Sequence, residues 1–170
     1  MSVREPYAPD VDPEAEAPAA LGDLVDVVVE GADWSNARAV RTTLTRVELR
    51  ACRLTGIELA EAKLNDVVFA ECRLDLAALR FAQLERVAFR GCRLEEADFH
   101  GATLRDVAFE RCELREATLT GVTVERVRIS GGDLGGLRGA EALRGVTMDW
   151  ADVVANGPLF AAALGIDIAD

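Results

Sequence analysis

The sequence predicts an all-β solenoid, a parallel β-helix in which the chain turns a corner every five residues and closes a four-sided coil every twenty. Two observations predict this fold. Residues 31–135 divide into 21 units of five residues, and the fourth residue of every unit is apolar. The second residue is nearly always small, most often Ala, Val or Cys. A helix spaces apolar residues by about 3.6 positions and a strand by 2, so neither explains a strict period of five.

Closure of a coil after four units predicts that residues twenty apart stack in columns. The sequence contains such columns of cysteines, of valines and of large apolar residues. They are Cys52, Cys72, Cys92 and Cys112; Val47, Val67, Val87, Val107 and Val127; and Leu49, Phe69, Phe89, Phe109 and Ile129. Stacked coils would lie about 4.8 Å apart, the spacing of neighbouring strands. The columns therefore favour a filled core with like residues on like residues.

The first positions of the units face solvent at the corners. On the valine face they alternate in sign, as Arg46, Asp66, Arg86, Asp106 and Arg126. We expect each of these charges to be satisfied from above and below. Exposed pairs of this kind contribute about 0–1 kcal/mol each, whereas like charges in those places would repel.

Two first positions are apolar, Leu76 and Phe81, and Val68 and Ala78 are outward as well. Adjacent apolar groups on a rod can mark a contact patch for a partner. The alternative is that the coil is locally distorted and buries them.

Three regions follow from the composition. Residues 1–20 are rich in Pro, Ala, Asp and Glu, which predicts a disordered acidic tail. Residues 21–148 form the β-helix, with an imperfect last coil after residue 135. Residues 149–170 form two short helices, with Asp149 as the first N-cap and Asp152 three residues on, and Pro158 in the first turn of the second helix.

This C-terminal segment has two candidate roles. An open solenoid end is an unpaired β edge, so the helices are expected to cap it. The alternative is a dimer interface through the apolar residues Trp150, Val153, Val154, Leu159, Phe160 and Leu164.

Charge excludes direct nucleic-acid binding through the average field, since the formal net charge is −11. Residues 1–30 hold one Arg and eight carboxylates, while residues 31–135 hold 16 basic and 17 acidic groups. The acidity therefore lies mostly in the flanks. The sequence contains no run of 18 apolar residues, so we expect no membrane span. The first residues lack the apolar core of a signal peptide. We expect a cytoplasmic protein.

No catalytic or metal-binding pattern occurs. Four cysteines in one column would span about 14 Å, far too much for one tetrahedral zinc ion, so they are expected to be buried thiols. His100 is the only histidine and has no catalytic partner. The sequence therefore predicts a protein that is not an enzyme, without cofactor or metal, and acts by binding a protein partner.

The five-residue units resemble those of the pentapeptide-repeat proteins, whose consensus is a small residue, a polar one, and Leu or Phe at the centre. The resemblance implies a right-handed, quadrilateral parallel β-helix. The ending PLFAAALGIDI is similar to the C-terminal segment of the branch that protects DNA gyrase from quinolones, in which that segment makes the dimer.

The resemblance implies a specific function, a DNA mimic that modulates DNA gyrase and confers quinolone resistance as a homodimer. In this chain mimicry depends on acidic patches, because the repeat region is nearly neutral. The alternative is an interaction module with another protein partner. The candidate partner-binding residues are Leu76, Phe81, Glu95, Glu96, Asp98, Glu110, Glu113 and Glu116.

Overall fold

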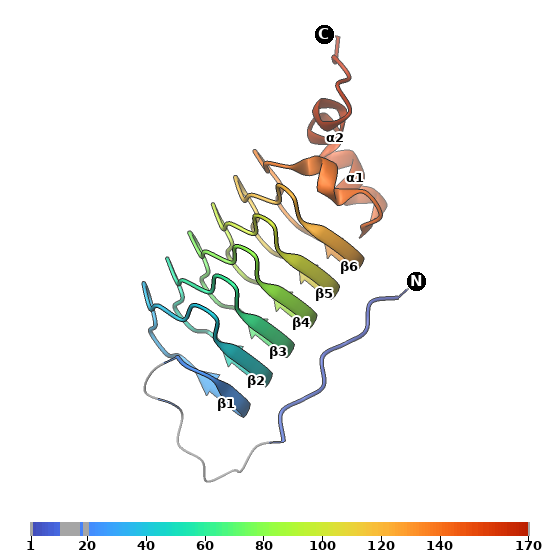
Figure 1. Ribbon diagram of the computed structural model, residues 1–170. Helices are drawn as coiled ribbons and strands as arrows, with labels where there is room; N and C mark the ends of the chain where they lie inside the picture. The colour runs from blue at the N-terminus through green and yellow to red at the C-terminus, as the bar shows by residue number, and fades with distance from the viewer. Residues whose placement is uncertain (1, 11–17, 19–20, 170) are drawn as a thin grey trace.

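The computed structural model is a right-handed, four-sided parallel β-helix, a rod with two short helices at its C-terminal end (Figure 1). It describes residues 2–10, 18 and 21–169. Seven strands pair in parallel in sequence order, each one coil above the last. They are β1 (Leu24–Glu30), β2 (Thr43–Arg50), β3 (Lys63–Ala70), β4 (Gln83–Arg90), β5 (Thr103–Glu110), β6 (Thr123–Ser130) and β7 (Thr147–Met148). The predicted fold class is confirmed.

The register has the predicted period of twenty. Val47 pairs with Val67, Val67 with Val87, and Val87 with Val107. Each long strand covers two faces of the rod, because it bends at a corner residue such as Arg46. The other two faces are held by single bridges, for example Arg53 to Arg73 and Glu58 to Ala78. The rod begins at Leu24, two units before the strict period.

Each corner is made by a residue with left-handed backbone geometry. The first residue of every unit from Asp26 to Gly136 has a positive φ, as in Leu76 (60°) and Phe81 (57°). Most of these residues are not glycine, although a left-handed residue with a Cβ costs about 1–2 kcal/mol. The corner is retained because the backbone N–H of the first residue donates to the next coil, as from Leu76 to Glu95 (2.8 Å).

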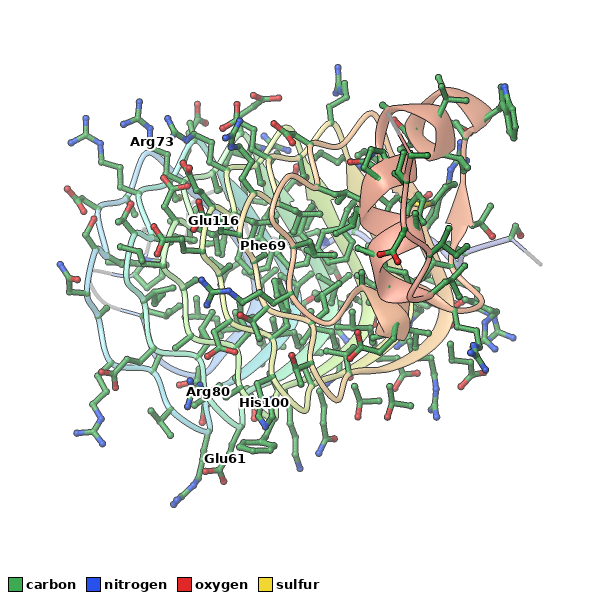
Figure 2. All side chains as sticks on the ribbon, turned by 90° about the horizontal axis from the view of Figure 1, so that it is seen from above. Glu61, Phe69, Arg73, Arg80, His100 and Glu116 are labelled. Carbon is green, nitrogen blue, oxygen red and sulfur yellow. The ribbon has the colours of Figure 1, made fainter. Side chains whose placement is uncertain are left out.

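The core is a stack of columns. All unit centres except Val124, near the end of the rod, are buried. The rings of Phe69, Phe89 and Phe109 stack nearly parallel, with centroids 4.9 and 5.0 Å apart. Phe99 meets the rings of Phe89 and Phe109 edge-on. Phe69 lies inside the rod in Figure 2. The core therefore leaves no internal space along these columns.

The C-terminal end closes the rod with the 3₁₀-helix η1 (Ala140–Leu143), then β7, α1 (Trp150–Ala155) and α2 (Gly157–Ala163). Leu159 and Phe160 of α2 pack against the core. The N-cap position of Asp149 is as predicted, but its side chain makes no capping bond. It lies instead 3.4 Å from Arg128, and the carboxylate of Asp152 accepts from the Gly131 backbone N–H (2.9 Å). The two carboxylates tie α1 to the last coil.

Residues 2–10 lie along the side of the rod formed by the long strands, which we call the strand face. They run from β5 toward β1 (Figure 1). This differs from the disordered tail predicted for residues 1–20, of which positions 1, 11–17, 19 and 20 lie outside the described residues. The physical reason is that backbone amides of the segment donate to carboxylates of the rod, as from Tyr7 to Asp66 (3.1 Å).

Candidate protein-contact surfaces

The two apolar corner residues are exposed, Leu76 by 56% and Phe81 by 55%. The alternative that the coil buries them is therefore excluded. Both residues have left-handed backbone geometry, with φ of 60° at Leu76 and 57° at Phe81. Leu76 and Phe81 bound the same face of the rod, formed by unit 76–80 and the units stacked on it. We call it the Leu76–Phe81 face.

Phe81 is held in a defined place at the edge of this face. Its ring meets the His100 ring edge-on at 5.5 Å and lies over Gly101, where an added Cβ would come within 2.5 Å of Phe81 Cε1. Glycine one coil further on therefore makes room for the ring. Beside it, Arg80 bonds Asp98 (2.5 Å). Arg80, His100 and Glu61 lie along one edge of the rod, away from Arg73 (Figure 2).

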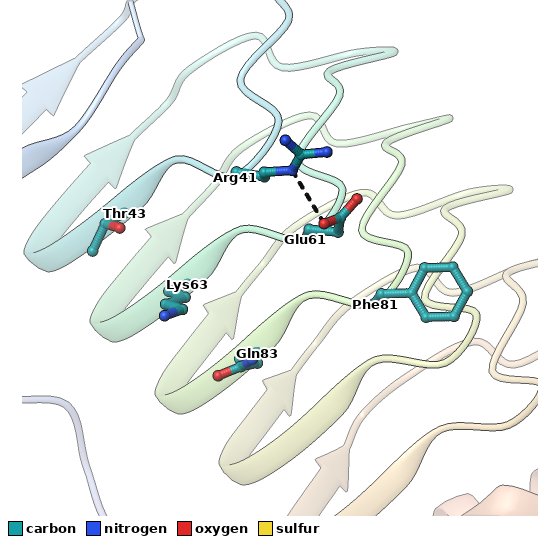
Figure 3. Close-up of a pocket in the computed structure, with 6 residues that line it drawn as sticks. All are labelled: Arg41, Thr43, Glu61, Lys63, Phe81 and Gln83. Carbon is teal, nitrogen blue, oxygen red and sulfur yellow. Dashed lines mark hydrogen bonds and ion pairs between the residues drawn. The ribbon is translucent and has the colours of Figure 1, made fainter.

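An open surface hollow of about 600 Å³ adjoins Phe81 (Figure 3). The Arg41 guanidinium bonds Glu61 at 3.2 Å across its wall. The hollow is lined by Arg41, Thr43, Glu61, Lys63, Phe81 and Gln83. Charged and polar side chains, together with the Phe81 ring, thus form the wall of this hollow.

In the structure, the predicted acidic residues fall into two groups, those without an ion pair among the described residues and those paired with an arginine. Glu96 and Glu116 stack in the same corner row as Leu76, twenty and forty residues on, and neither has an ion pair among the described residues. The others are paired with arginines. Asp98 bonds Arg80; Glu95 and Glu113 lie 3.5 and 3.4 Å from Arg93; and Glu110 lies on a different corner, 3.3 Å from Arg90. The rod therefore carries no continuous acidic stripe.

The alternating charges of the valine face form pairs rather than a continuous ladder. Arg46 bonds Asp26 (2.5 Å), Arg86 bonds Asp66 (2.7 Å) and Arg126 bonds Asp106 (2.7 Å), each one coil back. Contrary to the expected exposure, Asp66 and Asp106 are buried. The hydrogen bond from Arg46 and the backbone N–H of Asp10 lower the pKa of Asp26 to about 2. The hydrogen bond from Arg126 likewise lowers the pKa of Asp106, against the effect of burial.

Sequence reasoning missed the contact between this row and residues 2–10. The Arg86 guanidinium lies over the Tyr7 ring, 5.7 Å from its centroid, and Arg90 bonds Glu5 (2.8 Å). A usable signal is present in the spacing of Val3, Pro6 and Pro9, but a three-residue pattern over so short a segment is weak.

We expect the thiols of the cysteine column to be unreactive. All four thiols are free and buried, and each donates to a backbone carbonyl, as from Cys92 to Phe69 (3.3 Å). Hydrogen bonds with the thiols of Cys112 and Cys72, and then burial, raise the pKa of Cys92. Among residues 2–10, 18 and 21–169, no three His, Cys, Asp or Glu side chains are placed to hold a metal ion. No helix in that part of the chain is long and apolar enough to cross a membrane.

The predicted dimer residues separate into two groups. Leu159 and Phe160 face the core and cap it, and Val153 is half-buried. The exposed group is Trp150, Val154 and Leu164, joined by Ile166 and Ile168. The C-terminal segment therefore caps the rod and still presents apolar side chains.

The five-residue period, its left-handed corners and the filled columns agree with the comparison of the chain with known families. The pentapeptide repeat region matches residues 42–134, and the pentapeptide repeats (8 copies) match residues 23–59. The chain belongs to the pentapeptide-repeat family. No curated protein matches it.

Several solved structures are similar to the chain. A pentapeptide repeat protein from the Arabidopsis thaliana thylakoid lumen is 24% identical, with a TM-score of 0.54 over 57% of this chain and 68% of that one. HetL, involved in heterocyst differentiation regulation in the cyanobacterium Nostoc, is 21% identical, with a TM-score of 0.46 over 74% of this chain and 65% of that one. QnrB1, a plasmid-mediated fluoroquinolone resistance protein, is 18% identical, with a TM-score of 0.37 over 89% of this chain and 100% of that one. The likeness to the thylakoid-lumen protein, the one of these three with a TM-score above 0.5, concerns the fold alone.

Proposed function

We propose that this pentapeptide-repeat protein is a non-enzymatic binding rod whose protein partner contacts the Leu76–Phe81 face. The observation that carries the proposal is the exposure of Leu76 and Phe81 on one face, where Leu76 shares its corner row with Glu96 and Glu116, which lack ion pairs among the described residues. Exposed apolar side chains rimmed by charges are typical of protein contact sites. The partner surface that fits is apolar and flanked by Lys or Arg.

The specific partner we propose is DNA gyrase, with the chain acting as a cytoplasmic homodimer. Two features support it. The C-terminal sequence resembles the dimerising segment of gyrase-protecting proteins, and α1 and α2 leave Trp150, Val154 and Leu164 exposed, as a segment that pairs with a second copy requires. The acidic residues that would meet the basic DNA-binding surface of gyrase are Glu96 and Glu116, because the other candidates are neutralised by arginines.

The first experiment titrates the protein into a gyrase supercoiling assay, with and without a fluoroquinolone. We expect inhibition, or rescue from drug-induced cleavage, at micromolar protein. Leu76→Ser/Phe81→Ser should weaken the effect at least tenfold, and Glu96→Gln/Glu116→Gln should weaken it most at low salt. Val25→Ser is the matched control, since Val25 is 57% exposed on the first coil.

The outcomes separate the two levels of the proposal. No effect on gyrase at tens of micromolar protein rejects gyrase as the partner. A protein captured by the native chain but not by Leu76→Ser/Phe81→Ser would then retain the binding face. Light scattering tests the dimer: Trp150→Ser/Val154→Ser should be monomeric if the native chain is dimeric, and a monomeric native chain at about 100 µM rejects the homodimer.

A further inference from the structure

Residues 2–10 contact the rod with a period of three. Val3, Pro6 and Pro9 are half-buried, whereas the residues between them are exposed. The residue after each of these three donates its backbone N–H to a rod carboxylate. The bonds run from Arg4 to Asp106, from Tyr7 to Asp66 and from Asp10 to Asp26, and each is 3.1 Å long.

The acceptors have a matching period along the rod. Asp26, Asp66 and Asp106 stand forty residues apart, which is two coils, or about 9.6 Å at strand spacing. Three residues of polyproline II span about 9.3 Å and complete one turn of that helix. A β-strand has a similar rise, about 10 Å in three residues, but its side chains alternate with a period of two and would not return to the rod every third residue. The spacing therefore fits a polyproline II segment.

Ion pairs on the rod hold the acceptor carboxylates in fixed orientations. Arginines on the intervening coils hold the carboxylates, with Arg86 binding both oxygens of Asp66 and Arg126 both oxygens of Asp106. The alternation of Asp and Arg thus places an oriented acceptor on every second coil. A fixed carboxylate recognises backbone N–H groups, whatever side chains the segment carries.

Small apolar side chains lie beside the acceptor row. Ala88 and Ala108 stand at outward positions of β4 and β5 yet are only 1% and 4% exposed, and they are not part of the core cluster. Ser2, Val3 and Glu5 border the same hollow as Ala108. Residues of this size leave a shallow strip in which a chain can lie close to the strands.

From this match we propose that the strand face is a binding groove for an extended polyproline II peptide that has a proline or small apolar residue at every third position, filled here by the chain's own residues 2–10. The groove recognises the peptide by accepting hydrogen bonds from its backbone N–H groups at every third residue. It lies across the rod from the Leu76–Phe81 face, so it is independent of the function proposed above.

The test removes the N–H groups and keeps the polyproline II geometry. In the full chain, Arg4→Pro/Tyr7→Pro/Asp10→Pro deletes the three donors, and proline suits this conformation. The matched control Arg4→Ala/Tyr7→Ala/Asp10→Ala loses the same side chains but keeps the donors. A fluorescent peptide with the sequence of residues 2–10 is titrated with the native chain and both variants, and its anisotropy is measured.

We expect the peptide to bind the triple-proline chain at least tenfold more tightly than the native or triple-alanine chain, whose grooves are filled. In the native chain, the amides of Arg4, Tyr7 and Asp10 should exchange with solvent more slowly than those of Glu5 and Ala8. Equal affinity for all three chains, no binding to the triple-proline chain, or equal exchange rates would overturn the proposal. A native dimer that the three prolines dissociate would assign the groove to a second copy and overturn the intramolecular occupant.

Discussion

The phenylalanine stack is the part of the core on which a single substitution should act most strongly. Phe89 lies between Phe69 and Phe109 and also meets Phe99 edge-on. Truncation of a buried Phe to Ala costs about 3–5 kcal/mol, and each aromatic pair adds about 0.5–1.5 kcal/mol beyond buried area. Because Phe89 loses two stacked partners at once, we expect Phe89→Ala to lower the free energy of unfolding by about 4–5 kcal/mol.

Two further variants give this prediction its scale. Phe89→Leu should cost about 1–3 kcal/mol, because leucine fits the same column, as Leu49 shows, but loses both stacked ring partners. Phe81→Ala removes the same atoms from an exposed corner and should change stability by less than about 0.5 kcal/mol.

The assay is urea unfolding followed by circular dichroism. At about 2 kcal/mol per molar urea, Phe89→Ala should lower the midpoint by about 2 M and Phe81→Ala should leave it nearly unchanged. Equal midpoints for Phe89→Ala and Phe89→Leu would refute the cavity contribution, because leucine refills most of the volume that alanine leaves empty. A loss from Phe81→Ala as large as that from Phe89→Ala would show that Phe81 belongs to the core.

Three other measurements test an ion pair, two glycines of the last, irregular coil, and the thiols. The pKa of Asp26 is about 2 in the folded chain, against about 3.9 in the unfolded chain. Ionised Asp26 therefore stabilises the fold fully above about pH 4, and this contribution is lost as the pH falls through 2. Urea midpoints measured at several pH values should converge for the native chain and Asp26→Asn in acid. Gly139→Ala should cost at least about 2 kcal/mol more than Gly145→Ala in thermal unfolding, since both glycines have positive φ but only at Gly139 would the Cβ meet backbone, 2.5 Å from the Thr120 nitrogen. The four cysteines should be unreactive to a thiol reagent in the folded chain and all reactive in guanidinium, and rapid labelling without denaturant would contradict their burial.

The five-residue period determined the fold because each position in a unit has one direction relative to the rod. Centres such as Phe89 point inward in every coil, so one repeated apolar residue specifies a whole column. The period of twenty specified the strand register for the same reason: a slip of one residue would place the Cys92 column outside. Geometry of this kind is local and repeats, and it can be read from spacing.

The sequence also placed Leu76 and Phe81 at corners, but it could not decide between exposure and burial. Only the packing around each corner decided it: Leu76 and Phe81 are exposed, whereas Asp66 and Asp106, at corners with the same left-handed backbone, are buried. The sequence placed Glu96 and Glu116 at corners as well, but it did not show which candidate carboxylates have an arginine partner. Only the placement of the arginines on neighbouring coils showed which acidic groups are neutralised.

The acceptor row of Asp26, Asp66 and Asp106 was visible in the sequence as an alternation of sign, whereas its occupant was not. Arg4 and Asp106 are separated by 102 residues, and Asp10 and Asp26 by 16. The donors lie three residues apart and the acceptors forty, so the two segments share no common period in the sequence. Their contacts depend on a rise of three polyproline II residues equalling two coils, and that equality exists only once the coils are stacked.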